Sequence, residues 1–188
     1  MFQIRGLGLF ASGALIGGLT EGIRAAGDGR DFWNGGKWKT VNKYSLPDGD
    51  LPKAKQPQKE VGCTQTVLES NAEAQGRPIT IENKNEGVDY AILAREHGFE
   101  TNTVMPGTSN SEHTVGAQLI LGNPAAITYN EHTVGLNSIE VQQVPRLFGS
   151  GVKTRRLIQV MDPLYGEFRR MPISQFRNGV IRVHVPLK

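Results

Sequence analysis

The order of its segments is the feature that most constrains the fold of this chain. Three segments with helical patterns come first, between residues 63 and 122, and segments rich in β-branched residues follow between residues 125 and 185. Helices that precede strands, instead of alternating with them, favour an antiparallel sheet with helices packed on it over a parallel sheet with crossover helices. The sequence therefore predicts an α+β domain.

Glycine and proline indicate where these elements end. The first expected helix stops at Gly76, with Pro78 just beyond, and the second stops at Gly98. The third begins at Ser109 or Asn110, both acceptable N-caps, and reaches residue 122. The first two helices are expected over residues 63–75 and 89–97, and the strands over residues 125–129, 132–144, 155–161, 167–171 and 180–185.

The first 57 residues differ in composition from the rest. Glycines punctuate an apolar run from Gly6 to Leu19, and that run is shorter than the roughly 20 residues that span a bilayer as a helix. A signal peptide is an alternative, because Arg5 precedes the run, but no small-x-small cleavage site follows. We therefore predict a Gly-rich extension over residues 1–57 and a domain over residues 58–188, with membrane contact limited to residues 6–19.

Charge and cysteine content exclude several classes of function. The net charge of the 188 residues is only +3, and the lysines and arginines are scattered, which argues against nucleic-acid binding. A single cysteine forms no intramolecular disulfide and no two-cysteine metal site, and the four histidines lack zinc-ligand spacing. No metal or cofactor is expected.

The single cysteine, Cys63, stands where a loop gives way to the first expected helix. The unpaired N–H groups and the positive end of the helix dipole favour a thiolate at such a position. An inert, buried small hydrophobe is the alternative reading of a lone cysteine. Cys63 is therefore a candidate nucleophile whose partners have to come from the strand region.

Four motifs occur in an order that resembles papain-like cysteine peptidases, and most of all the branch that trims double-glycine leaders from bacteriocins. The resemblance covers about residues 58 to 176. The motifs are Gly62-Cys63 at a helix start, Gly122-Asn123-Pro124-Ala125-Ala126-Ile127 followed by His132 at a strand start, Gln159-Val160-Met161-Asp162-Pro163, and Met171-Pro172-Ile173-Ser174-Gln175-Phe176.

The resemblance implies a papain-like fold and a role for each matched residue. Cys63 corresponds to the nucleophile, His132 to the general base and acid, and Asp162 to the carboxylate that orients the imidazole. The family's oxyanion donor is a glutamine several residues before the cysteine. Gln58 is the favoured match and Gln56 the alternative, and neither stands at the offset typical of papain.

Other residues compete for these roles. The sequence Glu-His-Thr-Val-Gly occurs twice, so His113 rivals His132, but His113 falls in the third expected helix. Asn137 is an alternative partner for the imidazole. Asp162 precedes Pro163, so turn formation alone also accounts for it.

A second resemblance concerns the biological setting. The Gly-rich segment that runs into residues 28–35 resembles the junction that precedes C-terminal toxin domains in bacterial polymorphic toxins. This implies a secreted effector of interbacterial competition that is delivered into a target cell, cleaves a protein or peptide there, and is restrained by a cognate immunity protein. The alternatives are a papain-fold deamidase, transglutaminase or peptidoglycan amidase, which share the triad, and a non-enzymatic membrane-inserting or binding module.

Overall fold

The computed structural model describes residues 39–53, 62–82, 84–104, 107, 109–145 and 151–186. These residues form an α+β structure with a seven-stranded sheet, which confirms the predicted class. The chain divides into two compact units. One contains the described residues between 42 and 140 and between 156 and 186, including the three candidate catalytic residues, and the other contains the described residues of 39–41 and 141–155.

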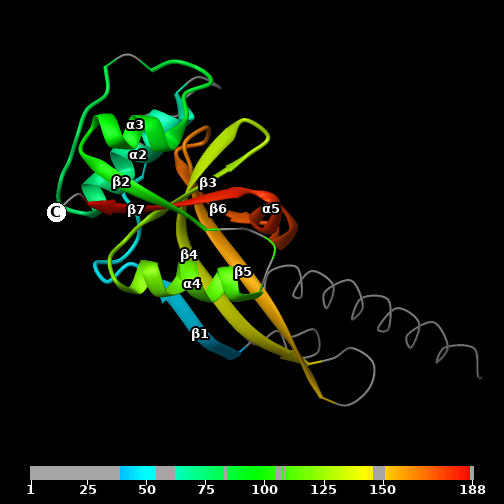
Figure 1. Cartoon of the computed structure of the whole chain (residues 1–188). Coiled ribbons are helices and arrows are strands. Elements are labelled where there is room, and N and C mark those ends of the chain that lie inside the picture. Colours follow the sequence, from blue (N-terminus) through cyan, green and yellow to red (C-terminus); the bar gives the residue numbers. More distant parts are fainter. Residues whose placement is uncertain are drawn as a thin grey trace, which may run out of the picture. The chain divides into compact units, whose positions relative to one another are not determined.

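Figure 1 shows the helices and strands in chain order from blue to red. The helices are α2 (Cys63–Ala74), α3 (Tyr90–Glu96), α4 (Ser109–Ile120) and α5 (Ile173–Asn178). The strands are β1 (Lys39–Ser45), β2 (Phe99–Val104), β3 (Ala125–Tyr129), β4 (His132–Pro145), β5 (Val152–Asp162), β6 (Glu167–Met171) and β7 (Val180–Pro186).

The sheet is ordered β2-β7-β3-β4-β5-β6, and β1 pairs with β4. The last strand of the chain, β7, runs antiparallel between β2 and β3. Two hairpins provide the middle and one edge, with Tyr129 opposite His132 in β3–β4 and Asp162 opposite Glu167 in β5–β6. Both candidate partners of Cys63 therefore stand at the turn ends of hairpins.

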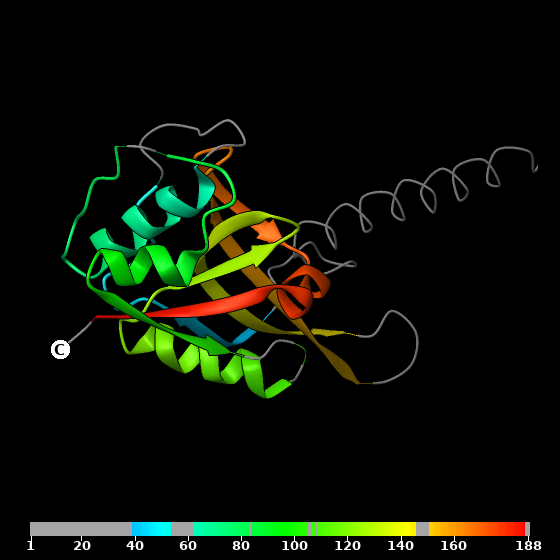
Figure 2. The ribbon, with the colours of Figure 1, turned by 45° about the horizontal axis from the view of Figure 1, so that its top comes forward.

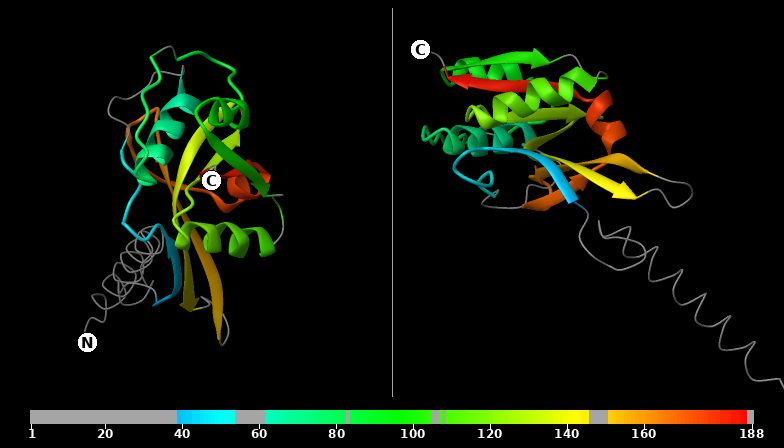
Figure 3. Two further views of the ribbon diagram at one scale, coloured as in Figure 1. Left: turned by 60° about the vertical axis from the view of Figure 1, so that its left-hand side comes forward. Right: turned by 90° about the horizontal axis from the view of Figure 1, so that it is seen from below.

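The helices cover the sheet from two sides. Helices α2 and α3 contact each other, α2 contacts β3, and α3 contacts β2 and β7. Helix α4 also contacts β2 and lies on the other side of β2 and β7 from α2 and α3 (Figures 1 and 2). Helix α5 contacts β3 and lies where β7 begins (Figure 3). Fully buried side chains between these layers include Leu68, Phe99, Leu119, Ile127, Leu136, Phe176 and Ile181.

The helices and strands expected from the sequence all form, with ends shifted by a few residues at most. Asp89 caps α3, and its carboxylate accepts hydrogen bonds from the backbone N–H groups of Ala91 and Ile92 at 2.8 and 3.0 Å. Pro47 and Asp48 form a turn, which the isolated β-bridge between Leu46 and Gly49 closes. Strands β1 and β2 and helix α5 were not expected.

The structure differs from the sequence prediction for residues 39–53, which the sequence assigned to the extension. These residues contain β1, and Tyr44, Leu46 and Leu51 are buried. The backbone N–H of Leu51 donates to Asn137 Oδ1 at 2.7 Å. Polar side chains dominate this stretch, so composition assigns it to a linker. Three buried apolar residues, the pairing of β1 with β4 and several hydrogen bonds anchor it to the domain instead.

No helix among the described residues is long and apolar enough to cross a membrane. Residues 6–19, to which membrane contact was assigned, lie outside the described residues.

Candidate active site

Cys63 is the first residue of α2, and Gly62 precedes it as the N-cap in the left-handed conformation with φ of 87°. A glycine has no side chain to accept hydrogen bonds from the first helical turn, and no side-chain cap is present. The N–H groups of this turn therefore stay available for a negative charge on the sulfur or on a bound oxygen.

The Lys84 side chain packs against Gly62, which explains why only glycine fits before Cys63. A Cβ atom on Gly62 would stand 2.7 Å from Lys84 Cβ. The Lys84 side chain is fixed, because its Nζ donates to Glu69 Oε2 at 2.6 Å and to Thr66 Oγ1 at 3.1 Å. Both acceptors belong to α2, so these two bonds hold the segment around Lys84 against the helix that carries Cys63.

A two-residue turn presents His132 at the start of β4. Asn130 and Glu131 both have positive φ, 45° and 63°, as a type I′ hairpin turn requires. This turn places His132 directly opposite Tyr129. The two rings meet edge to face with centroids 5.8 Å apart, so Tyr129 limits how the imidazole can tilt.

Asp162 ends β5 and holds the imidazole. His132 Nε2 donates to Asp162 Oδ1 at 2.9 Å, across 30 residues of sequence. The same oxygen accepts from the backbone N–H of Leu164 at 3.1 Å, and the Asp162 side chain is only 7% exposed. The buried carboxylate is thereby fixed in orientation, and Nδ1 of His132 is the ring nitrogen left to face a reacting group.

Arg169 occupies the other side of the carboxylate. Its Nη1 lies 3.5 Å from Asp162 Oδ2. The guanidinium also lies over the Tyr165 ring, with Cζ 4.0 Å from the centroid, and Tyr165 belongs to the turn that follows Asp162. Arg169 thus favours the charged form of Asp162, although its own side chain is 45% exposed and the effect is screened by solvent.

The environment lowers the pKa of the Cys63 thiol. Burial opposes this by raising the pKa, but hydrogen bonds to the His132 side chain, the Thr133 backbone and the Thr64 side chain, together with the charge of His132, outweigh it. The net direction is that of a reactive cysteine and not of an inert, buried one.

The same contacts raise the pKa of His132 to about 9, chiefly through the hydrogen bond to Asp162 and next through that to Cys63. Burial raises the pKa of Asp162, but its bond to His132 and the positive charges around it lower the pKa overall. All three shifts favour one state, in which a thiolate faces an imidazolium that a carboxylate stabilises.

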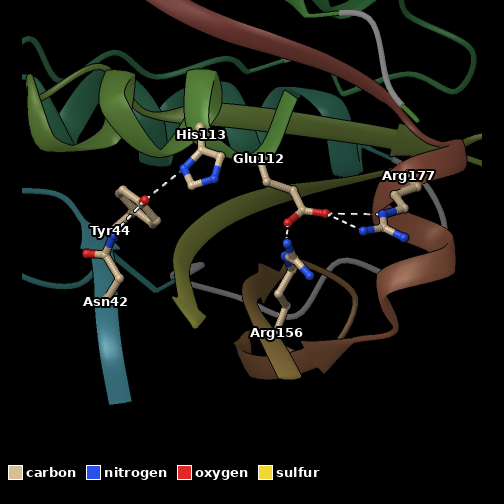
Figure 4. A network of polar contacts seen from close by, with 6 residues as sticks. All are labelled: Asn42, Tyr44, Glu112, His113, Arg156 and Arg177. Atoms are coloured by element: carbon tan, nitrogen blue, oxygen red, sulfur yellow. Dashed lines mark hydrogen bonds and ion pairs between the residues drawn. The ribbon is translucent and has the colours of Figure 1, made fainter. Parts of the chain in front are cut away.

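The competing histidine lies in a different network (Figure 4). His113 Nδ1 lies 2.9 Å from the Tyr44 hydroxyl, which also accepts from Asn42 at 2.6 Å. Beside it on α4, the buried Glu112 pairs with Arg177 at 2.8 Å and with Arg156. The two copies of Glu-His-Thr-Val-Gly therefore make different contacts, and the copy on α4 links α4 to β5 and α5 through the ion pairs of Glu112.

Asn137 also bonds away from the imidazole. Its Nδ2 donates to Asp50 Oδ1 at 2.8 Å and to Gln159 Oε1 at 3.0 Å, and its Oδ1 accepts from Leu51. His184 is fully buried against Phe99, with ring centroids 4.2 Å apart, and burial lowers its pKa to about 4. His132 is thus the histidine that meets Cys63 and Asp162.

Gln58 and Gln56, the predicted oxyanion donors, lie outside the described residues. Within the described part of the chain, no group of three or more histidine, cysteine or acidic side chains is arranged to hold a metal ion.

Sequence reasoning missed the residues that support the triad, Tyr129, Thr64, Thr133, Tyr165 and Arg169. For three of them the signal is their position. Thr64 and Thr133 each follow a candidate catalytic residue, and Arg169 pairs opposite Val160, on the face of the hairpin that carries Asp162.

No protein-family model matches the chain, and no curated protein is significantly similar to it. Evidence for function therefore comes from the geometry of Cys63, His132 and Asp162.

Proposed function

We propose that this chain is a cysteine peptidase of the papain-like type, with Cys63 as nucleophile, His132 as general base and acid, and Asp162 as the orienting carboxylate. The observation that carries the proposal is the Nε2–Oδ1 hydrogen bond of 2.9 Å between His132 and Asp162, together with the hydrogen bond of His132 to Cys63, the first residue of a helix. A nucleophile, a base and a group that orients the base define this kind of site whatever the fold.

In the first half of the reaction, the Cys63 thiolate attacks the carbonyl carbon of the scissile amide. The carbonyl π electrons move to oxygen, and the N–H groups of the first α2 turn are placed to stabilise that charge. Imidazolium Nδ1–H of His132 then donates its proton to the amide nitrogen. The C–N bond breaks, the amine leaves, and a thioester remains on Cys63.

In the second half, neutral His132 takes a proton from water, and the resulting hydroxide attacks the thioester. The C–S bond breaks, and the acid product leaves with Cys63 again a thiolate and His132 again an imidazolium. Asp162 keeps Nε2–H in place throughout, so that Nδ1 alternates between donor and acceptor.

The test is expression of the full chain and of Cys63→Ser in bacterial cells, followed by mass spectrometry of cellular protein N-termini. New N-termini in the wild type but not in Cys63→Ser support a peptidase. Conversion of glutamine to glutamate in cellular proteins without new N-termini would indicate a deamidase instead of a peptidase. The same new N-termini in Cys63→Ser as in the wild type would overturn the proposal that Cys63 is the nucleophile.

We further propose that the peptidase serves as a secreted antibacterial toxin. The support is the Gly-rich segment ahead of the domain, by its resemblance to polymorphic toxins. A producing cell needs protection from such an enzyme, so a cognate immunity protein is expected to cover Cys63 and His132 through an interface of roughly 1,600 Å² in total. The test is to co-express this chain with the protein encoded by the gene next to its own. Protection of Cys63 from iodoacetamide by that protein supports the proposal, and an alkylated Cys63 in the complex opposes it.

A further inference from the structure

Three threonine hydroxyls form a chain beside the triad. Thr64 follows Cys63 in α2, Thr133 follows His132 in β4, and Thr128 lies opposite Thr133 in β3. The oxygens of Thr64 and Thr133 are 3.1 Å apart, and those of Thr133 and Thr128 are also 3.1 Å apart. Thr64 and Thr133 are buried, at 7% and 1% exposure.

The first of these bonds connects the two elements that have to meet for catalysis. It spans 69 residues and joins the opening turn of α2 to the start of β4, one residue beyond each reacting side chain. A hydrogen bond between buried groups has a narrow range of length and angle, and its loss leaves an unsatisfied hydroxyl. It therefore fixes where the helix end stands relative to the hairpin.

The hydrogen bonds that link the three threonine hydroxyls all donate in the same direction. Each hydroxyl has one proton to donate and two lone pairs to accept with. Thr64 directly follows Cys63, and hydrogen bonding by its side chain helps to lower the pKa of the thiol, which uses the only Thr64 proton when the sulfur is a thiolate. Thr64 then accepts from Thr133, and Thr133 accepts from Thr128.

We propose that the hydroxyls of Thr128, Thr133 and Thr64 donate in that order toward Cys63, so that Thr64 and Thr133 are positioning residues that hold the sulfur opposite His132. The inference rests on the proposed function, because it concerns the nucleophile of that reaction. Successive donation polarises each hydroxyl in turn, and the low dielectric of the buried site strengthens the last bond, which ends on the charged sulfur.

The experiment measures the rate of Cys63 alkylation by iodoacetamide against pH, by intact mass, for the wild type, Thr64→Val, Thr133→Val, Thr128→Val and Thr64→Ser. The midpoint of each curve of rate against pH reports the pKa of the Cys63 thiol. We expect Thr64→Val to raise this midpoint by about one pH unit, since it removes a hydrogen bond to a charged group. Thr133→Val should raise it less, because the Thr64 proton remains. Thr128→Val keeps the Thr64–Thr133 bond and should raise the midpoint least of the three. Thr64→Ser is the matched control, because it keeps the hydroxyl and should have the wild-type midpoint.

A purely structural role would lower the melting temperature of these variants without this graded order of midpoints. Wild-type midpoints in both Thr64→Val and Thr133→Val, or an unrescued midpoint in Thr64→Ser, would overturn the inference and leave the proposed function standing. A wild-type protein that titrates as an ordinary thiol would overturn both. Near-ultraviolet circular dichroism checks folding, and if Thr133→Val does not fold, Thr64→Val against Thr64→Ser decides alone.

Discussion

His132 and Asp162 stand at the turn ends of two different hairpins, and their side chains meet at 2.9 Å between Nε2 and Oδ1. Each hairpin is short and local, but the meeting depends on the sheet order that places β4 next to β5. The bond selects which imidazole nitrogen faces Cys63. The chemistry of the site is thus fixed by sheet pairing and turn geometry together.

Replacing the two histidines of the repeated Glu-His-Thr-Val-Gly sequence separates their roles. His132→Ala removes the imidazole beside Cys63, so we expect alkylation of Cys63 by iodoacetamide at pH 6 to slow by at least about tenfold, the factor that one pKa unit produces. His113→Ala is the matched control and loses only the contact with Tyr44. Equal slowing by both variants, or slowing by His113→Ala alone, would contradict the assignment.

Asp162→Asn tests the source of the raised His132 pKa. The hydrogen bond to Asp162 is the largest contribution to the pKa of about 9, so we expect that pKa to fall by about one unit or more. Nitrogen-detected NMR titration of the histidine ring measures it. An unchanged His132 pKa in folded Asp162→Asn would show that the carboxylate does not stabilise the imidazolium.

The same variant has a consequence for stability. A histidine pKa above its unfolded value of 6.5 contributes stability that is complete below pH 6.5 and is lost as the pH rises through about 9. Urea unfolding should therefore show a larger difference between wild type and Asp162→Asn at pH 6 than at pH 10. The opposite order would contradict the sign of the shift.

Gly62→Ala tests the backbone before the nucleophile. The substitution has to adopt positive φ and also displace Lys84, so we expect a loss of unfolding free energy of about 2 kcal/mol or more, together with slower Cys63 alkylation. Gly76→Ala is the matched control. Gly76 also has positive φ, 68°, but a Cβ there meets nothing within 4 Å, so only the backbone cost of about 1 kcal/mol applies. Equal losses would show that Lys84 packing is unimportant.

Glu112→Gln tests the network in Figure 4 as a structural feature apart from the site. The carboxylate is 4% exposed and pairs with two arginines, so its neutralisation should cost about 3 kcal/mol of unfolding free energy. Glu140→Gln neutralises a more exposed carboxylate, which pairs at 3.9 Å with one lysine, Lys43, so it should cost less than Glu112→Gln. Alkylation of Cys63 should be unchanged in folded Glu112→Gln, and a slower rate would link this network to the site.

The sequence predicted well those elements whose signals are local. Strands β3 and β6 have the predicted bounds, and Gly76, Gly98 and Gly122 all have positive φ just past helix ends. Cys63 at a helix start, and His132 and Asp162 at strand ends, also follow from local signals. The meeting of the three side chains was implied by resemblance alone.

What the sequence missed depends on tertiary context. Strand β2 carries polar residues at most positions and is a strand because Phe99 is buried and β7 pairs with it. Helix α5 is a short segment after Pro172 that is anchored by the buried Phe176. Thr64 and Thr133 each follow a candidate catalytic residue in the sequence, but their hydrogen bonds to each other and to Thr128 could not be predicted, because the three residues come from three elements that meet only in the folded protein.

The most direct test of the central claim is the pH dependence of Cys63 alkylation by iodoacetamide in the wild type and in His132→Ala. We predict that wild-type Cys63 reacts as a thiolate well below the pKa of a free thiol, about 8.5, because His132 lowers its pKa. His132→Ala should shift the midpoint upward, toward that of a free thiol. A wild-type curve with the midpoint of an ordinary thiol, superimposable on that of His132→Ala, would contradict the assignment of Cys63 as an activated nucleophile.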